Sequence, residues 1–189
     1  MTDLPDPATA KRRLLDHLRR HSLRTDGPFT LSSGAASDWY LDARRSLYTG
    51  EAALSCGITL LDVLTPFDVD AIGGLTMGAD PVALATALAG ELTGRPLSAF
   101  SIRKEAKGHG AGGRVVGMLD AGTRVAVVDD TQTTGASLFE AVAVVRELGA
   151  RVVVLAVVVD RSAGVLAERA LDAGLPLRAL FTPSDLGVA

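Results

Sequence analysis

An acidic and hydroxyl-rich segment at residues 127–137 carries the side chains best suited to chemistry in this chain. It reads Val-Val-Asp-Asp-Thr-Gln-Thr-Thr-Gly-Ala-Ser. Asp129 and Asp130 can accept hydrogen bonds from the vicinal hydroxyls of a ribose, or help to hold Mg²⁺ near them. The apolar run before the acids is typical of a buried strand, so we expect both acids at the end of that strand, facing a crevice.

The residues that follow the acids are suited to bind one phosphate group. Threonine hydroxyls and free backbone N–H groups from Thr131 to Ser137 can surround a phosphate, and Gly135 lets the backbone approach it closely. A helix is expected to begin here, and its N-terminal end adds positive potential. An ordinary strand–turn–helix connection is the simpler alternative, but it does not require this order of residues. The predicted site for a phosphorylated sugar comprises Asp129, Asp130, Thr131, Gln132, Thr133, Thr134, Gly135, Ala136 and Ser137.

A basic, glycine-rich segment at residues 103–113 could bind a polyanion. Its glycines predict a mobile backbone, and its charges suit a group such as pyrophosphate. A solvated basic loop is the common alternative. The groups that can be cationic are Arg103, Lys104, Lys107 and His109.

These two segments, with a third at residues 29–42, resemble one family of enzymes. Asp-Asp-Thr-Gln-Thr-Thr-Gly resembles the phosphoribosyl pyrophosphate (PRPP) motif of type I phosphoribosyltransferases. Arg-Lys-x-x-Lys-x-His-Gly resembles the catalytic lid of orotate phosphoribosyltransferases. Phe-Thr-Leu-Ser-Ser-Gly, followed by Ser-Asp-Trp-Tyr-Leu-Asp, resembles the N-terminal stretch of the same enzymes. That family often has a lysine where Ser32 stands, a lysine near Met77 and an apolar residue in place of Gln132, which we expect to be a loop position.

The resemblance implies a reaction and its participants. Orotate and PRPP would give orotidine 5′-monophosphate and pyrophosphate, a step of pyrimidine (UMP) biosynthesis. Mg²⁺ would arrive with PRPP near Asp129 and Asp130, with no direct protein ligand assigned. Because the lid of this family serves a neighbouring subunit's site, a homodimer is implied.

The resemblance also implies roles for individual residues. Those implied to be catalytic are Arg103, Lys104, Lys107, His109 and Asp130. The loop implied to hold the pyrophosphate of PRPP contains Thr76, Met77 and Gly78. Those implied to contact orotate are Thr133, Arg161, Tyr40 and Leu41.

The order of expected elements predicts an α/β fold with a mostly parallel sheet flanked by helices. Helices are expected over 8–21 and 50–64, from Asp80 as N-cap, and from a capping box at Ser137 and Glu140 to Gly149. Strands are expected over 69–75, 97–102, 113–118, 124–128 and 152–159. In a parallel sheet the carboxyl ends of the strands lie at one edge, so Leu75, Asp129 and Arg161 should share a crevice. The resemblance adds a type I phosphoribosyltransferase fold with a small N-terminal hood over residues 1–45 and a flexible lid loop over 103–113.

Composition limits the other classes of function. The 189 residues suit a single domain, and the net charge of -3 argues against general nucleic-acid binding. Cys56, the only cysteine, lies in an apolar helical pattern and is expected in the core. No apolar run approaches the length of a membrane span, and no signal peptide opens the chain, so a cytoplasmic protein without nucleic-acid or membrane partners is expected.

The sequence leaves two other functions open. A phosphoribosyltransferase acting on a different base would use the same PRPP motif, and Ser32 leaves room for that alternative. A PRPP-binding regulator without turnover would need the motif but not the basic lid.

Overall fold

A six-stranded sheet forms the centre of the protein. The computed structural model describes residues 4–30, 36–105 and 113–188. The strand order is β10-β9-β8-β5-β6-β7, and β7 alone runs antiparallel to its neighbour. The strands are β5 (Ala71–Leu75), β6 (Ser98–Ile102), β7 (Val115–Gly117), β8 (Arg124–Gln132), β9 (Arg151–Asp160) and β10 (Leu177–Phe181).

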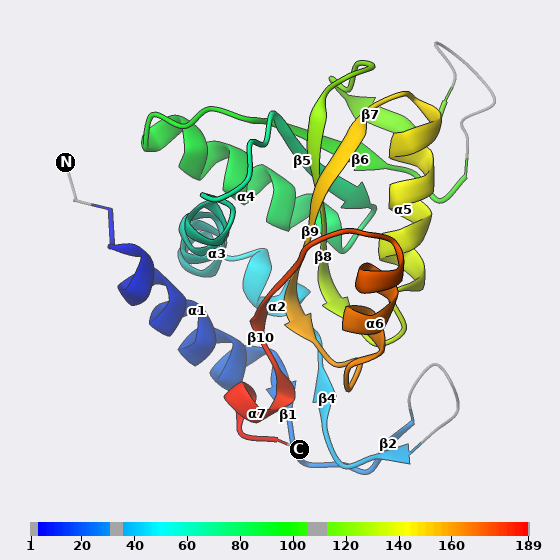
Figure 1. Ribbon diagram of the computed structural model, residues 1–189. Helices are drawn as coiled ribbons and strands as arrows, with labels where there is room; N and C mark the ends of the chain where they lie inside the picture. The colour runs from blue at the N-terminus through cyan, green and yellow to red at the C-terminus, as the bar shows by residue number, and fades with distance from the viewer. Residues whose placement is uncertain (1–3, 31–35, 106–112, 189) are drawn as a thin grey trace.

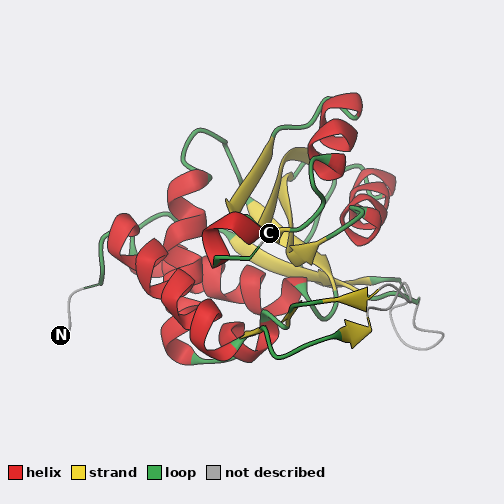
Figure 2. Cartoon of the chain, turned by 90° about the horizontal axis from the view of Figure 1, so that it is seen from below, coloured by secondary structure: helices red, strands yellow, loops and turns green. Residues whose placement is uncertain are grey.

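Helices cover both faces of this sheet (Figures 1 and 2). One face packs against the helices α1, α2, α3 and α4, and the other packs against α5 and α6. The helices are α1 (Pro7–His21), α2 (Arg44–Leu47), α3 (Gly50–Val63), α4 (Ala79–Leu92), α5 (Ala136–Glu147), α6 (Val165–Asp172) and α7 (Pro183–Leu186).

Alternation along β8 explains how one strand serves both layers. Val125 and Val127 belong to the core under α5 and α6, whereas Ala126 and Val128 belong to the core under α1, α3 and α4. Successive side chains of a strand point to opposite faces, and a strand covered on both faces is therefore apolar throughout. The α/β fold with a mostly parallel sheet, expected from the sequence, is confirmed.

The N-terminal part of the chain also forms two small antiparallel pairs. Strand β1 (Leu23–Arg24) pairs with β4 (Tyr40–Leu41), and β2 (Phe29–Thr30) pairs with β3 (Ala36–Ser37). Figure 1 shows β4 next to the ends of β8 and β9.

Two of the predicted helix caps, at Asp80 and Ser137, were wrong. Helix α4 begins at Ala79 with Gly78 in the N-cap position, and the Asp80 carboxylate instead accepts a hydrogen bond of 2.7 Å from the Ser101 hydroxyl. Helix α5 has Gly135 in the N-cap position, so Ser137 and Glu140 form no capping box. Tertiary partners for these side chains outweighed local capping. Gly149, by contrast, has a φ of 77° just after α5, as a helix C-terminus favours.

Cys56 lies in the core, as its apolar helical pattern predicts. Cys56 is fully buried in α3, and burial raises its pKa to about 12, so the prediction of a core cysteine is confirmed. Within the described ranges, none of the helices is both long and apolar enough to cross a membrane.

Candidate active site

A crevice of about 670 Å³ opens at the carboxyl ends of β5, β8 and β9. The predicted convergence of three strand ends is therefore correct, since Leu75, Asp129 and Arg161 all line it. Strand β4 and helix α2 provide the opposite wall. The predicted site residues that line the crevice are Tyr40, Leu41, Thr76, Met77, Gly78, Lys104, Asp129, Asp130, Thr131, Thr133, Thr134, Ser137 and Arg161.

Some predicted site residues are placed elsewhere. Arg103 follows β6, where its N–H bonds to the Arg114 carbonyl, and it is not part of the crevice wall. Gln132, Gly135 and Ala136 lie behind the wall rather than on it. Lys107 and His109 lie outside the described residues.

The two acids lie within β8 rather than after it, which corrects the expected strand end. Strand β8 continues from Arg124 to Gln132, and Asp129 and Asp130 are only 6% and 8% exposed. The alternation of the strand sends Asp129 toward α5 and Asp130 toward α2. Adjacent carboxylates therefore have different surroundings, although both reach the crevice.

Asp129 is held by three donors. Its Oδ1 accepts the Asp130 N–H at 2.9 Å, and its Oδ2 accepts the Gln132 amide at 2.5 Å and the Ser137 hydroxyl at 2.8 Å. Gln132, one of these donors, is the last residue of β8 and is 3% exposed, so its predicted loop position was wrong. Burial, followed by the neighbouring charge of Asp130, raises the pKa of Asp129 to about 7. The carboxylate is thus fixed in position, in surroundings that favour its protonated form more than water does.

This raised pKa predicts a pH-dependent cost of folding. The unfolded group titrates near 4, so between about pH 4 and 7 the folded state binds more protons than the unfolded state, and the free energy of unfolding falls as pH rises. The variant Asp129→Asn does not titrate and escapes this loss. We therefore expect its melting temperature, relative to the unsubstituted protein, to rise progressively between about pH 5 and 7 in the absence of ligand. Calorimetric melting of both proteins across this range tests it, and a difference that stays constant with pH would contradict it.

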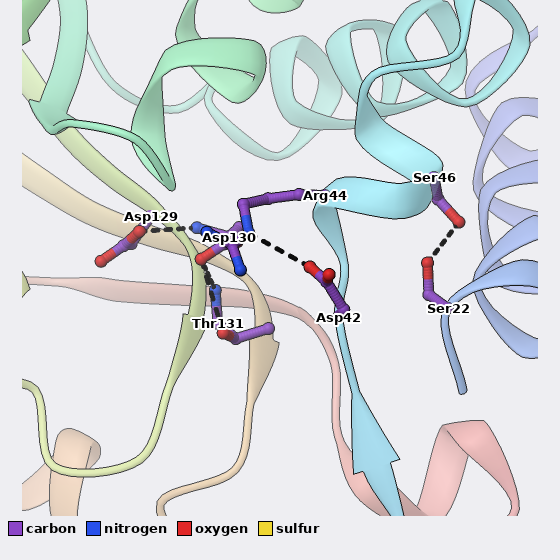
Figure 3. A network of polar contacts seen from close by, with 7 residues as sticks. All are labelled: Ser22, Asp42, Arg44, Ser46, Asp129, Asp130 and Thr131. Atoms are coloured by element: carbon purple, nitrogen blue, oxygen red, sulfur yellow. Dashed lines mark hydrogen bonds and ion pairs between the residues drawn. The ribbon is translucent and has the colours of Figure 1, made fainter. Parts of the chain in front are cut away.

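Asp130 faces a basic side chain that the sequence did not single out. Arg44, the first residue of α2, lines the crevice, and its Nε donates to Asp42 Oδ1 at 3.1 Å. Figure 3 shows Arg44 lying between Asp42 and Asp130. Burial raises the pKa of Asp130, while hydrogen bonds such as that from the Thr131 N–H and the charge of Arg44 lower it. The two acids therefore differ in electrostatic environment as well as in direction.

The loop after β8 has fewer free donors than the sequence predicted for it. Gly135 has a φ of 78°, and a Cβ there would meet Leu166 at 2.9 Å, so both conformation and space favour glycine. The Thr131 N–H already bonds to Asp130, and the Ala136 N–H bonds to the Thr134 hydroxyl at 3.3 Å. The N-terminal end of α5 and the remaining hydroxyls still face one end of the crevice.

A second loop, Thr76 to Gly78, packs directly on the acids. A Cβ on Gly78 would overlap the Oδ1 atoms of both Asp129 and Asp130. Glycine is thus required by close approach, and the start of α4 stands beside the carboxylates. Met77 in the same loop is 58% exposed.

Arg161 forms the other end of the crevice, just beyond β9. Its guanidinium lies over the Trp39 ring, 4.1 Å from the centroid, and its backbone N–H bonds to the Gln132 carbonyl at 2.7 Å. Its Nε is buried and finds no hydrogen-bond partner among the described residues, and desolvation lowers the pKa of the side chain. A buried donor without a partner is costly, which sets Arg161 apart from the other polar residues of the crevice.

Comparison with known proteins decides the family. No family model matches the chain. It is 49% identical to the orotate phosphoribosyltransferase of Streptomyces avermitilis over 162 residues, which cover 86% of this chain and 89% of that protein. It is also 39% identical to the orotate phosphoribosyltransferase of Aquifex aeolicus, over 93% of this chain and 97% of that protein. The chain belongs to the orotate phosphoribosyltransferase family.

Solved structures of this family have the same fold. The orotate phosphoribosyltransferase of Mycobacterium tuberculosis in complex with Fe(III) dicitrate aligns with a TM-score of 0.85 and 41% identity, covering 95% of this chain and 99% of that one. The same protein in complex with PRPP aligns with a TM-score of 0.81 and 37% identity, with the same coverage. The family that the sequence motifs resemble is thus confirmed.

Two residues of this orotate phosphoribosyltransferase family member were missed by sequence reasoning. Arg44 lines the crevice, and Trp39 supports Arg161. Trp39 is the single tryptophan of the chain and adjoins a predicted orotate residue, which was a usable signal. Arg44 had no such signal, because two adjacent arginines outside any motif are ordinary.

Proposed function

We propose that this chain transfers the phosphoribosyl group of PRPP to orotate in the crevice described above. The C1–oxygen bond to pyrophosphate would break, and a bond from C1 to a ring nitrogen of orotate would form, giving orotidine 5′-monophosphate for UMP synthesis. The observation that carries the proposal is the Arg161 guanidinium, held over the Trp39 ring in the same crevice as the acid pair and the phosphate loop. A carboxylated base suits the arginine, and a phosphorylated sugar suits the acids and the loop.

Each predicted residue has a physical task in this scheme. Asp129 and Asp130 would orient the ribose hydroxyls, and Thr131, Thr133, Thr134 and the start of α5 would bind the 5′-phosphate. The loop of Thr76, Met77 and Gly78 would lie along the pyrophosphate. Orotate would contact Thr133, Tyr40, Leu41 and Arg161, whose planar fork suits a carboxylate. Catalysis would come from positioning and from charge stabilisation of the departing pyrophosphate.

The acid pair also fits a magnesium ion that comes with PRPP. Among the described residues there is no group of three or more His, Cys, Asp or Glu side chains that could hold a metal ion. Mg²⁺ commonly uses one or two carboxylates together with waters and substrate phosphates. Asp129 and Asp130 would offer the carboxylates of this donor set. The ion would supply charge neutralisation for the phosphate oxygens.

The rest of the assignment extends beyond the crevice. Residues 103–113 would act as a lid that brings Arg103, Lys104, Lys107 and His109 to the pyrophosphate, and in a homodimer this lid would serve the partner's site. The chain would form one domain, with residues 1–45 as its hood, and would work in the cytoplasm without nucleic-acid or membrane partners.

Pyrophosphate release tests the proposed function directly. Purified protein with PRPP and Mg²⁺ should release pyrophosphate on addition of orotate, and should do so far more slowly with uracil, adenine or guanine. Release with another base but not with orotate would favour a phosphoribosyltransferase of different specificity. PRPP binding by calorimetry without release for any base would favour a regulator.

A further inference from the structure

The pyrophosphate end of the crevice contains a basic side chain that no motif accounts for. Three cations line the described crevice: Arg44, Lys104 and Arg161. Arg161 is assigned to the base, and Lys104 is the second residue of the basic segment after β6. The loop beside the acids presents the uncharged Met77, so its own side chains offer no positive charge to a diphosphate.

Arg44 is held by a contact at Nε, and the rest of its guanidinium remains available for a ligand. Its Nε bonds to Asp42, while its two terminal nitrogens have no hydrogen-bond partner within the described ranges. The side chain is 45% exposed, in the crevice. The two-point fork of an arginine suits phosphate oxygens, and here its outer edge is available for them.

The helix that carries Arg44 is fixed by buried polar contacts. Ser46 Oγ, on the opposite side of α2, lies 2.6 Å from Ser22 Oγ and 2.9 Å from His17 Nδ1 (Figure 3 shows the Ser22–Ser46 bond). Helix α2 also packs against α4, whose first residues stand beside the acids. Helix α2 therefore holds Arg44 in a fixed position, facing both Asp130 and the loop of residues 76–78.

We propose that Arg44 binds the diphosphate of PRPP, next to Asp130, and supplies the positive charge that the Met77 loop lacks. This inference rests on the proposed function and adds a substrate contact to it. In the free protein Arg44 balances the buried acid. With PRPP bound, its terminal nitrogens would face the diphosphate oxygens while Nε stays on Asp42, so Asp42 would act as the orienting partner.

Binding and kinetics of Arg44→Gln test the proposal. We expect the KM for PRPP and the Kd for inorganic pyrophosphate with Mg²⁺ to rise roughly tenfold, the lower range for a charge-assisted hydrogen bond because the site is half exposed. The KM for orotate and the Kd for ribose 5-phosphate should stay the same, because neither ligand carries the diphosphate. Arg44→Lys should recover part of the pyrophosphate affinity.

Arg45→Gln is the matched control, since Arg45 is the next residue of α2, is exposed and does not line the crevice. It should leave all four constants unchanged. Unaltered pyrophosphate binding in Arg44→Gln, an equal loss of ribose 5-phosphate binding, or an equal effect of Arg45→Gln would overturn the proposal. Pyrophosphate binding is measured without orotate, so this outcome is independent of whether orotate is the base that is used.

Discussion

Lys107→Ala is expected to lower kcat by about a hundred- to a thousand-fold, the usual cost of removing one electrostatic contact made in the transition state. Lys107 belongs to the basic, glycine-rich segment, and it lies outside the described residues. As the bond from C1 to pyrophosphate breaks, negative charge grows on the leaving group, so a lysine that meets it then stabilises the transition state more than the ground state. PRPP affinity should change far less than turnover.

Steady-state kinetics and PRPP calorimetry measure the two effects separately. Arg13→Ala is a suitable control, because Arg13 is an exposed cation on α1 that does not line the crevice. It corrects for a general change in net charge. Unchanged kcat in Lys107→Ala would remove this residue from the catalytic group, and a fall in PRPP affinity equal to the fall in kcat/KM would make it a binding residue instead.

Arg161→Lys is expected to raise the KM for orotate roughly ten- to a hundred-fold, the range for a lost charge-assisted hydrogen bond. Lysine keeps the charge but offers a single point rather than a planar fork, and it has no Nε at the position of the buried, unpartnered donor. It would also lose the stacking of the guanidinium on Trp39. PRPP affinity should remain nearly unchanged, because the guanidinium lies over Trp39 and only the backbone N–H of Arg161 bonds to the phosphate segment, at Gln132.

Separate calorimetric titrations with orotate and with PRPP decide this prediction. Trp39→Phe offers a milder comparison, because it keeps an aromatic surface under an unchanged arginine. Loss of PRPP binding with orotate binding intact would place Arg161 on the phosphate side and reverse the proposed orientation of the two substrates in the crevice.

The order of residues along the chain was enough to predict the family, the sheet and the strand ends that meet. The phosphate segment needs local features only: two acids, threonines and a glycine whose φ of 78° other residues rarely adopt. The apolar run of β9 predicted a strand covered on both faces, because no other position accommodates so many adjacent β-branched side chains. These signals come from consecutive residues, so the sequence contains them in full.

Contacts between distant segments were decided by the tertiary structure alone. Arg44 lies 86 positions before Asp130 and carries no motif, and only the packing of α2 against α1, α3 and α4 brings it into the crevice. Asp80 has the chemistry of an N-cap but bonds to Ser101, and Ser137 bonds to Asp129 instead of capping α5. A local cap contributes about 1 kcal/mol, which a buried hydrogen bond to a strand or a carboxylate can match.

Gln132 shows the same division most clearly. Its place in the motif was visible in the sequence, but its buried bonds to Asp129 and Ser137 depend on β8 continuing four residues past the expected end. That extension comes from pairing with β9, where Thr131 lies opposite Val159 and Gln132 opposite Asp160. Sequence determined which groups this protein can use, and the pairing of strands decided which way each of them faces, because the side-chain direction in a strand alternates with every residue that the sheet adds.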